Sequence, residues 1–132
     1  IGISKDFNNF ELQKAIGQRD TLKANRIVHY YKNNINKHPM VLTLAMLYAF
    51  FAKIMLLHSL KDRSQDNLKA KLGVHPFFIK DYSSAARVYS PAKLTRIFGW
   101  LREYDLRSKG VNNSSTGHGE LLQELVFKIT HI

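Results

Sequence analysis

PMVLTLAMLYAFFAKIMLLHSLKD, residues 39–62, is the most apolar stretch of the chain and has no charged side chain from Met40 to Ala52. Its length and composition suit either a membrane span or the central helix of a protein core. Lys53 interrupts the apolar run, and a lysine at the centre of a bilayer costs about 3 kcal/mol. The uncharged part alone is too short to cross roughly 30 Å of hydrocarbon. We therefore expect a central helix that is apolar on all sides and that its neighbours bury.

The segments on either side of this stretch carry helix signals. Asp20 is placed to cap a helix in TLKANRIVHYYKNNI, and Ser90 is placed to cap another that Pro91 begins. A tight turn between two short helices is expected at LGVHP, where Gly73 suits a helix end and Pro76 a helix start. A final helix is expected in GELLQELVFKITHI. No segment shows sustained two-residue alternation of β-branched residues, so no strand is predicted.

These signals predict an all-α fold, a compact bundle of about five to seven helices. A length of 132 residues is typical of one domain, so we expect a single helical domain over residues 1–132. The chain has no cysteine, which excludes disulfides and thiolate metal sites and fits a reducing compartment. We therefore expect a cytoplasmic location.

The chain is strongly basic, with twenty lysine and arginine residues against ten acidic ones and a net charge of +10. Such an excess favours polyanions such as nucleic acids. The cations are spread over every segment, however, and no run of five or more occurs. Spread-out cations are typical of a solvated surface, so the charge alone does not predict a nucleic-acid site.

No arrangement of residues predicts catalysis. The phosphate-loop pattern GxxxxGK[ST] is absent, and TGHGE follows a polar loop rather than a strand. The histidines are scattered, with no HxxxH pair, and metal ligands must converge at about 2 Å. They are His29, His38, His58, His75, His118 and His131. We expect no catalytic residue, no metal and no cofactor in this chain, and therefore no enzymatic activity of its own.

The turn at LGVHPFF supports an alternative function, a basic nucleic-acid-binding module with a helix-turn-helix-like hairpin. Gly73 and Ile79 have the spacing of that motif. Lys69 stands where a small residue is usual, and Pro76 and two phenylalanines occupy positions where polar base-reading side chains are expected. We therefore favour an ordinary αα-hairpin within the bundle.

Two aromatic residues lie away from the apolar stripes of the last two predicted helices. At about 100° per residue, Phe127 falls opposite the stripe of its helix, and Trp100 lies at the shoulder of its own stripe. Arg96 and Arg107 flank Trp100, and aromatic residues with arginine neighbours are typical interface anchors. We predict a subunit interface at Trp100, Phe127, Arg96 and Arg107. The alternative is that a third helix of the same domain covers both aromatic residues.

ARVYSPAKLTRIFGWLREYDLRSKGVNN and GELLQELVFKI, which run from Ala86 to Ile129, resemble the C-terminal part of the delta subunit of the bacterial DNA polymerase III clamp loader. The family pattern joins an alanine followed by arginine or lysine, an aromatic residue, a serine, a leucine-spaced helix, Asp-Leu-x-x-Lys-Gly and a final apolar helix. In this chain the pattern is carried by Ala86-Arg87, Tyr89, Ser90, Leu94 to Leu101, Asp105-Leu106 and Lys109-Gly110. LGVHPFFIKDY and the opening IGISKDFNNFELQKAIGQRD are also similar to this family, so the similarity covers essentially the whole chain.

The resemblance implies a collar domain that holds the clamp-loader pentamer together and has no catalytic residue, although the complex belongs to the DNA polymerase III holoenzyme, a DNA-directed DNA polymerase. It implies partners of the delta-prime and gamma/tau type. The sliding clamp is then bound only through N-terminal domains that precede this chain, contact with DNA is indirect or weak, and no membrane is involved. Because the chain begins with Ile1 rather than methionine, we expect it to be excised from a longer protein.

Overall fold

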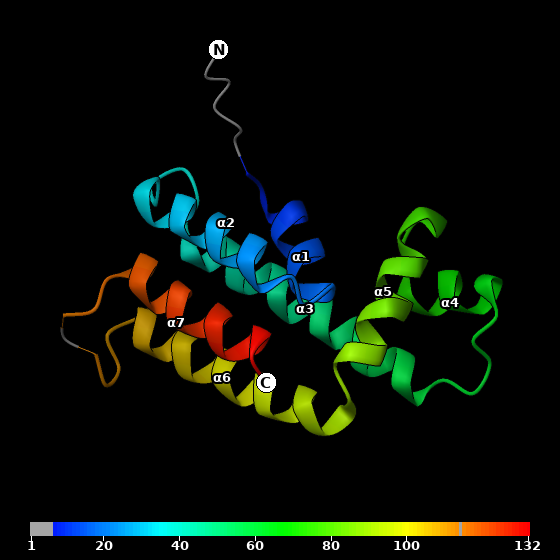
Figure 1. The fold of residues 1–132 in the computed structure, drawn as a ribbon. Coiled ribbons are helices and arrows are strands. Elements are labelled where there is room, and N and C mark those ends of the chain that lie inside the picture. The colour runs from blue at the N-terminus through cyan, green and yellow to red at the C-terminus, as the bar shows by residue number, and fades with distance from the viewer. Residues whose placement is uncertain (1–6, 114) are drawn as a thin grey trace, which may run out of the picture.

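The computed structural model describes residues 7–113 and 115–132, which form seven α-helices and no strand. The helices are α1 (Asn9–Gly17), α2 (Thr21–Asn33), α3 (Met40–Ser59), α4 (Gln65–Leu72), α5 (Pro76–Val88), α6 (Pro91–Ser108) and α7 (His118–Thr130). They pack as a bundle that is longer than it is wide, with α4 and α5 at one end and the loop between α6 and α7 at the other (Figure 1). The all-α fold predicted from the sequence is confirmed.

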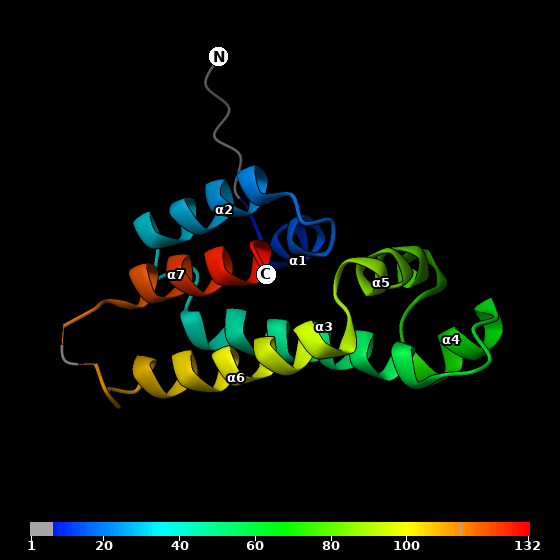
Figure 2. The same cartoon turned by 60° about the horizontal axis from the view of Figure 1, so that its bottom comes forward.

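The helices form two layers around a shared core. α2 and α7 form the upper layer in Figure 2, and α3 and α6 form the lower layer. α1 lies between α2 and α5 and contacts both. α7 contacts α1, α2, α3 and α6, which makes it the most enclosed helix of the upper layer. Five of its side chains are fully buried: Leu121, Leu122, Leu125, Val126 and Ile129.

Local signals in the sequence set the helix ends. The side chain of Asp20 accepts a hydrogen bond from the backbone N–H of Lys23 at 3.1 Å, and that of Ser90 accepts one from Lys93 at 3.3 Å. Each cap satisfies one of the backbone donors that a helix start leaves unpaired. Both predicted caps are therefore confirmed. Asn8 caps α1 in the same way.

The turn between α4 and α5 also follows its sequence signals. Gly73 ends α4 with φ +64°, in the left-handed region that glycine adopts without steric cost. Pro76 begins α5, where its missing N–H would have had no helical partner. The predicted hairpin is present, and Ile79 is its buried contact, with 7% of its surface exposed.

The junction between α1 and α2 is tied to the end of α7. The guanidinium of Arg19 donates from Nε to the carbonyl oxygen of Thr130 at 3.0 Å and from Nη2 to that of Ile132 at 2.5 Å. Carbonyls at a helix C-terminus lack intrahelical donors, and a cation placed there also matches the helix dipole. Arg19 thus closes the bundle between its first and last helices.

One expectation about the central helix is wrong. α3 contacts α1, α4, α5, α6 and α7, yet these neighbours bury only eight of its 20 residues. Val41 is 64% exposed and Leu42 is 59% exposed. By length and composition α3 is also apolar enough to cross a membrane, a property that core helices share. Since α3 is apolar on all sides, covering one side leaves an apolar stripe on the other.

Candidate subunit interface

The predicted interface residues of α6 lie in a row of cation–π contacts. The guanidinium carbon of Arg96 lies 5.3 Å from the ring centre of Trp100. Nζ of Lys128, on α7, lies 5.9 Å from the same ring and 5.1 Å from the ring of Tyr104. A cation over an aromatic ring contributes roughly 0.5–1 kcal/mol at an exposed site. Lys128 therefore joins α6 to α7 across the two aromatic residues.

A network around Tyr104 continues this row. Tyr104 is buried, and its hydroxyl donates to Oε2 of Glu124 at 3.1 Å. Arg107 lies 5.0 Å from the Tyr104 ring and donates to the same Glu124 oxygen at 3.4 Å. The hydrogen bond with Tyr104 raises the pKa of Lys128, and the nearby acids act in the same direction. A lysine is charged at neutral pH in any case, so the raised pKa extends the cation–π contacts of Lys128 to higher pH.

Phe127 forms the exposed edge of this surface. Its ring is 53% exposed and stacks on His131, with ring centres 4.0 Å apart. Phe127 and Arg107 line one open depression between α6 and α7, together with Tyr104, Glu124 and Lys128. The four predicted residues thus lie on a single face of the bundle, which we call the α6–α7 face. Their role in binding a subunit stays a prediction.

Three further residues, Tyr104, Glu124 and Lys128, belong to this face and were not predicted from the sequence. Tyr104 lies at helical spacing from the buried Ile97 and Leu101 of α6, which predicts a core residue, but its hydroxyl reaches the surface network. Glu124 and Lys128 are four residues apart on α7, a spacing that puts both on one side of a helix. Trp100 and Tyr104 have the same spacing on α6. These two matched pairs are the signal that could have found the network.

A second uncovered surface runs along α3. We call it the α3 stripe, and it consists of Val41, Leu42, Ala45, Ala49, Ala52 and Leu56. All six are exposed, and none is polar. From Val41 to Leu56 the α3 stripe runs for about 22 Å along the helix, at 1.5 Å per residue. Monomeric proteins rarely leave so long an apolar surface in water, and such surfaces mark interaction sites.

The hairpin that suggested a DNA-binding motif presents different chemistry. Phe77, in the first turn of α5, is 74% exposed, so an apolar ring occupies a position where a base-reading side chain is expected. His75 is turned back onto its own helix, where Nδ1 accepts the backbone N–H of Phe77 at 3.0 Å. His75 and Phe77, at the start of α5, therefore do not present the polar groups that direct reading of bases needs.

The described histidines serve local structure. Nε2 of His58 lies 2.8 Å from the carbonyl oxygen of Tyr89, and Nε2 of His118 lies 2.9 Å from that of Ser108. Within residues 7–113 and 115–132, no three histidine, aspartate or glutamate side chains are grouped to hold a metal ion.

Fold and surface together define the class: a small all-α bundle domain with two uncovered surfaces, one apolar and one aromatic and cationic. The family model described as "DNA polymerase III delta subunit, C-terminal domain" matches residues 6–126. The chain therefore belongs to the family formed by the C-terminal domains of delta subunits, which are structural domains of the clamp loader. No curated protein and no solved structure matched the chain.

Proposed function

We propose that this chain is a non-catalytic assembly domain that binds neighbouring clamp-loader subunits, of the delta-prime and gamma/tau type, and so holds together the pentamer that loads the sliding clamp. The α3 stripe is the observation that carries the proposal. Membership of the delta family supports it, because that family belongs to a complex of several subunits. We also propose that the domain works in the cytoplasm, where the clamp loader meets replicating DNA.

The α3 stripe has the chemistry that association requires. Burying apolar surface stabilises a complex by about 25 cal/mol per Å², less the cost of association. Charged residues are depleted at the centre of interfaces, and Lys53 is the one charged residue of α3, beside the stripe rather than on it. Alanines at positions 45, 49 and 52 allow another helix to approach closely along the middle of the stripe.

The α6–α7 face supplies a second and more polar surface. Trp100 and Phe127 are proposed as anchors, with Arg96 and Arg107 at the rim. Tryptophan and arginine are over-represented among the residues that dominate binding energy. The internal ion pairs of Arg107 fix its side chain before binding, so little side-chain entropy remains to be lost. A subunit inside a ring has two neighbours, and two separate faces suit that position.

Reconstitution tests the proposal directly. The 132-residue chain is mixed with purified delta-prime and gamma/tau subunits, and complexes are separated by size-exclusion chromatography with light-scattering mass measurement. We expect the chain to elute with these subunits in one complex of defined stoichiometry. Separate elution of all components at concentrations of tens of micromolar would refute the proposal.

A further inference from the structure

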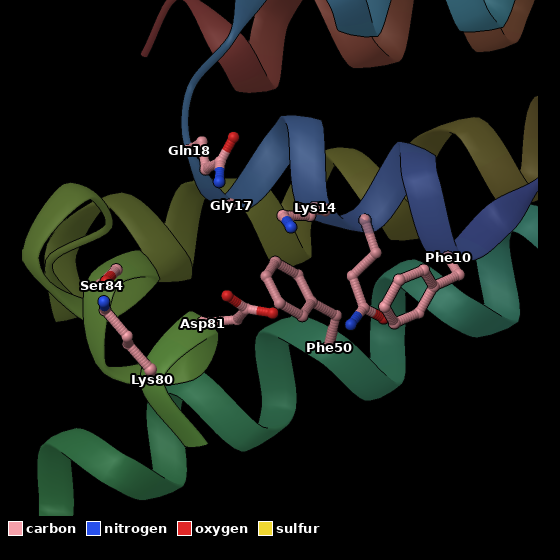
Figure 3. Close-up of a pocket in the computed structure, with 9 residues that line it drawn as sticks. Phe10, Lys14, Gly17, Gln18, Phe50, Lys80, Asp81 and Ser84 are labelled. Atoms are coloured by element: carbon pink, nitrogen blue, oxygen red, sulfur yellow. The ribbon is translucent and has the colours of Figure 1, made fainter. Parts of the chain in front are cut away.

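A groove of about 280 Å³ lies between α1 and α5, away from both surfaces described above. Its residues on α1 follow helical spacing, so one stripe of that helix forms one wall, and α5 forms the other. α3 closes the bottom with the ring of Phe50, as Figure 3 shows. Prominent lining residues are Phe10, Gln13, Lys14, Phe50, Lys80 and Asp81.

The floor of the groove is fixed. Phe50 is 2% exposed, and its ring centre lies 5.3 Å from that of Tyr82. At Gly17 the wall has no side chain, and a Cβ there would lie 3.0 Å from Cζ of Phe50. The groove is therefore formed before any ligand binds.

An aromatic row leads out of the groove. The ring centres of Phe10 and Phe78 are 5.3 Å apart, and those of Phe78 and Phe77 are also 5.3 Å apart, each pair edge to face. Phe10 is 47% exposed and Phe77 is 74% exposed. Three linked rings of which two are open to solvent form an apolar contact surface next to the groove.

The charges around the groove select its ligand. Lys14 on α1 and Lys80 on α5 are exposed and make no ion pair within the described part of the chain. These two ammonium groups favour carboxylates. Asp81 points its carboxylate toward the floor (Figure 3), where it can accept a peptide N–H and repels any anion. Acidic side chains of a ligand are therefore expected at the rim beside Lys14 and Lys80, with an uncharged part of the ligand over the floor. A volume near 280 Å³ is below the usual range of about 300–1,000 Å³ for small-molecule sites, and it suits a large side chain.

We propose that the α1–α5 groove binds a linear acidic peptide segment of a partner protein. An apolar side chain of the segment lies over Phe50, and a second apolar residue contacts the row from Phe10 to Phe77. Acidic residues of the segment pair with Lys14 and Lys80. Apolar contacts thus supply affinity, and the charges supply specificity and a faster encounter with an acidic segment.

Fluorescence anisotropy with designed peptides tests the ligand class. The probe is a labelled nine-residue peptide with Leu-Phe at its centre and Asp and Glu on both sides. One matched peptide replaces the flanking acids by lysine, and another replaces Leu-Phe by Ser-Ser. The 132-residue chain is expected to bind the probe at least roughly tenfold more tightly than either matched peptide. Equal binding of the three peptides, or no binding at millimolar protein, would overturn the proposal.

Charge reversal locates the site. The double variant Lys14→Glu with Lys80→Glu is expected to weaken probe binding at least roughly tenfold. The control variant, Lys69→Glu with Lys71→Glu, changes the net charge equally at exposed positions of α4 and is expected to bind the probe within about twofold of the parent chain. If probe binding weakened equally in both variants, the attraction would be non-specific, and the proposed location of the site would be wrong.

Competition separates the peptide from a nucleic acid. A 12-nucleotide single-stranded DNA is added to the complex of chain and probe at moderate salt. The peptide is expected to stay bound, because it can place an uncharged segment beside Asp81, whereas a DNA strand carries a negative charge at every nucleotide. Displacement by equimolar DNA would show that the groove binds nucleic acid instead. Neither result bears on the proposed subunit interface, which lies on α3, α6 and α7.

Discussion

The hydroxyl of Tyr89 donates a 2.7 Å hydrogen bond to the carbonyl oxygen of Ile16, 73 positions earlier in the chain. Both residues are fully buried. The ring of Tyr89 also packs edge to face on Phe51 of α3, with ring centres 5.3 Å apart. One side chain thereby joins the end of α5 to α1 and to the central helix.

Removing this hydroxyl is expected to destabilise the fold. Tyr89→Phe keeps the ring packing but loses the hydrogen bond, so the free energy of unfolding should fall by about 1 kcal/mol. Tyr48→Phe is the matched control, because the half-buried Tyr48 donates no hydrogen bond within the described residues. Urea unfolding followed by circular dichroism measures both changes. A loss in Tyr48→Phe as large as in Tyr89→Phe would contradict this role.

Buried tyrosines also predict unfolding at high pH. Burial raises the pKa of Tyr89 and of Tyr31 well above the ordinary value. The neutral hydroxyl is favoured in the folded state, so its contribution is complete below pH about 10 and is lost as the pH rises above that value. Each such tyrosine adds a slope of up to about 1.4 kcal/mol per pH unit.

Unfolding free energies measured between pH 8 and pH 11 check this expectation. Lysine deprotonation acts in the same pH range, so the parent chain is compared with Tyr89→Phe, which retains every lysine. The variant should lose stability less steeply above pH 10, because it has no hydroxyl at position 89 that ionises in the unfolded state. Identical slopes in the two proteins would contradict the assignment.

Residues that act through their near neighbours in the chain could be predicted from the sequence. Asp20 and Ser90 cap their helices, and Gly73 makes its turn, because each interacts with backbone within a few positions. The uncovered side of α3 could not be predicted in the same way. Periodicity indicates direction only when a helix has a polar side, and α3 has almost none. Whether neighbours cover it depends on the packing of the whole chain.

Part of the candidate interface could likewise be predicted from the sequence, and part depends on how the helices pack. The spacing of Phe127 on its helix predicts an outward position, and the ring is 53% exposed. Spacing could not predict that Lys128 of α7 reaches the rings of Trp100 and Tyr104 on α6, since that contact depends on how the two helices pack.

Adding a methyl group is expected to have opposite effects at two glycines, because Gly119 of α7 lies against α2 whereas Gly99 of α6 faces open space. A Cβ at Gly119 would lie 2.9 Å from Cα of Lys32, so Gly119→Ala should destabilise the fold by about 1–3 kcal/mol. A Cβ at Gly99, inside α6, meets nothing within 4 Å, so Gly99→Ala should stabilise it by about 0.8 kcal/mol through helix propensity. Thermal unfolding distinguishes the two, and a stabilised Gly119→Ala would contradict the packing of α7 on α2.

The rival nucleic-acid function predicts tight binding by the isolated chain. If the chain is an assembly domain, it should bind duplex and single-stranded DNA weakly at low salt, because of its net charge of +10, and should not bind at about 150 mM salt. Titrations of labelled oligonucleotides at several salt concentrations measure this dependence. Submicromolar binding that persists at moderate salt would favour the nucleic-acid module.

The α6–α7 face predicts a loss of assembly without a loss of folding. Trp100→Ala combined with Phe127→Ala should weaken binding to the delta-prime and gamma/tau subunits by more than about tenfold. Leu22→Ala is the control, because Leu22 is a 70% exposed apolar residue of α2 that lies outside the α3 stripe, the α6–α7 face and the α1–α5 groove. Surface-immobilised partner subunits give the affinities. Unchanged affinity in the double variant would remove both aromatics from the interface.

The most direct measurement places charge on the α3 stripe. Val41→Glu combined with Leu42→Glu is compared with Leu22→Glu, which alters a 70% exposed leucine on α2. Each chain is mixed with delta-prime and gamma/tau subunits and analysed by size-exclusion chromatography with mass measurement. We predict that the stripe variant stays folded but elutes alone, whereas Leu22→Glu elutes within the complex. A folded stripe variant that joins the complex with parental affinity would contradict the account.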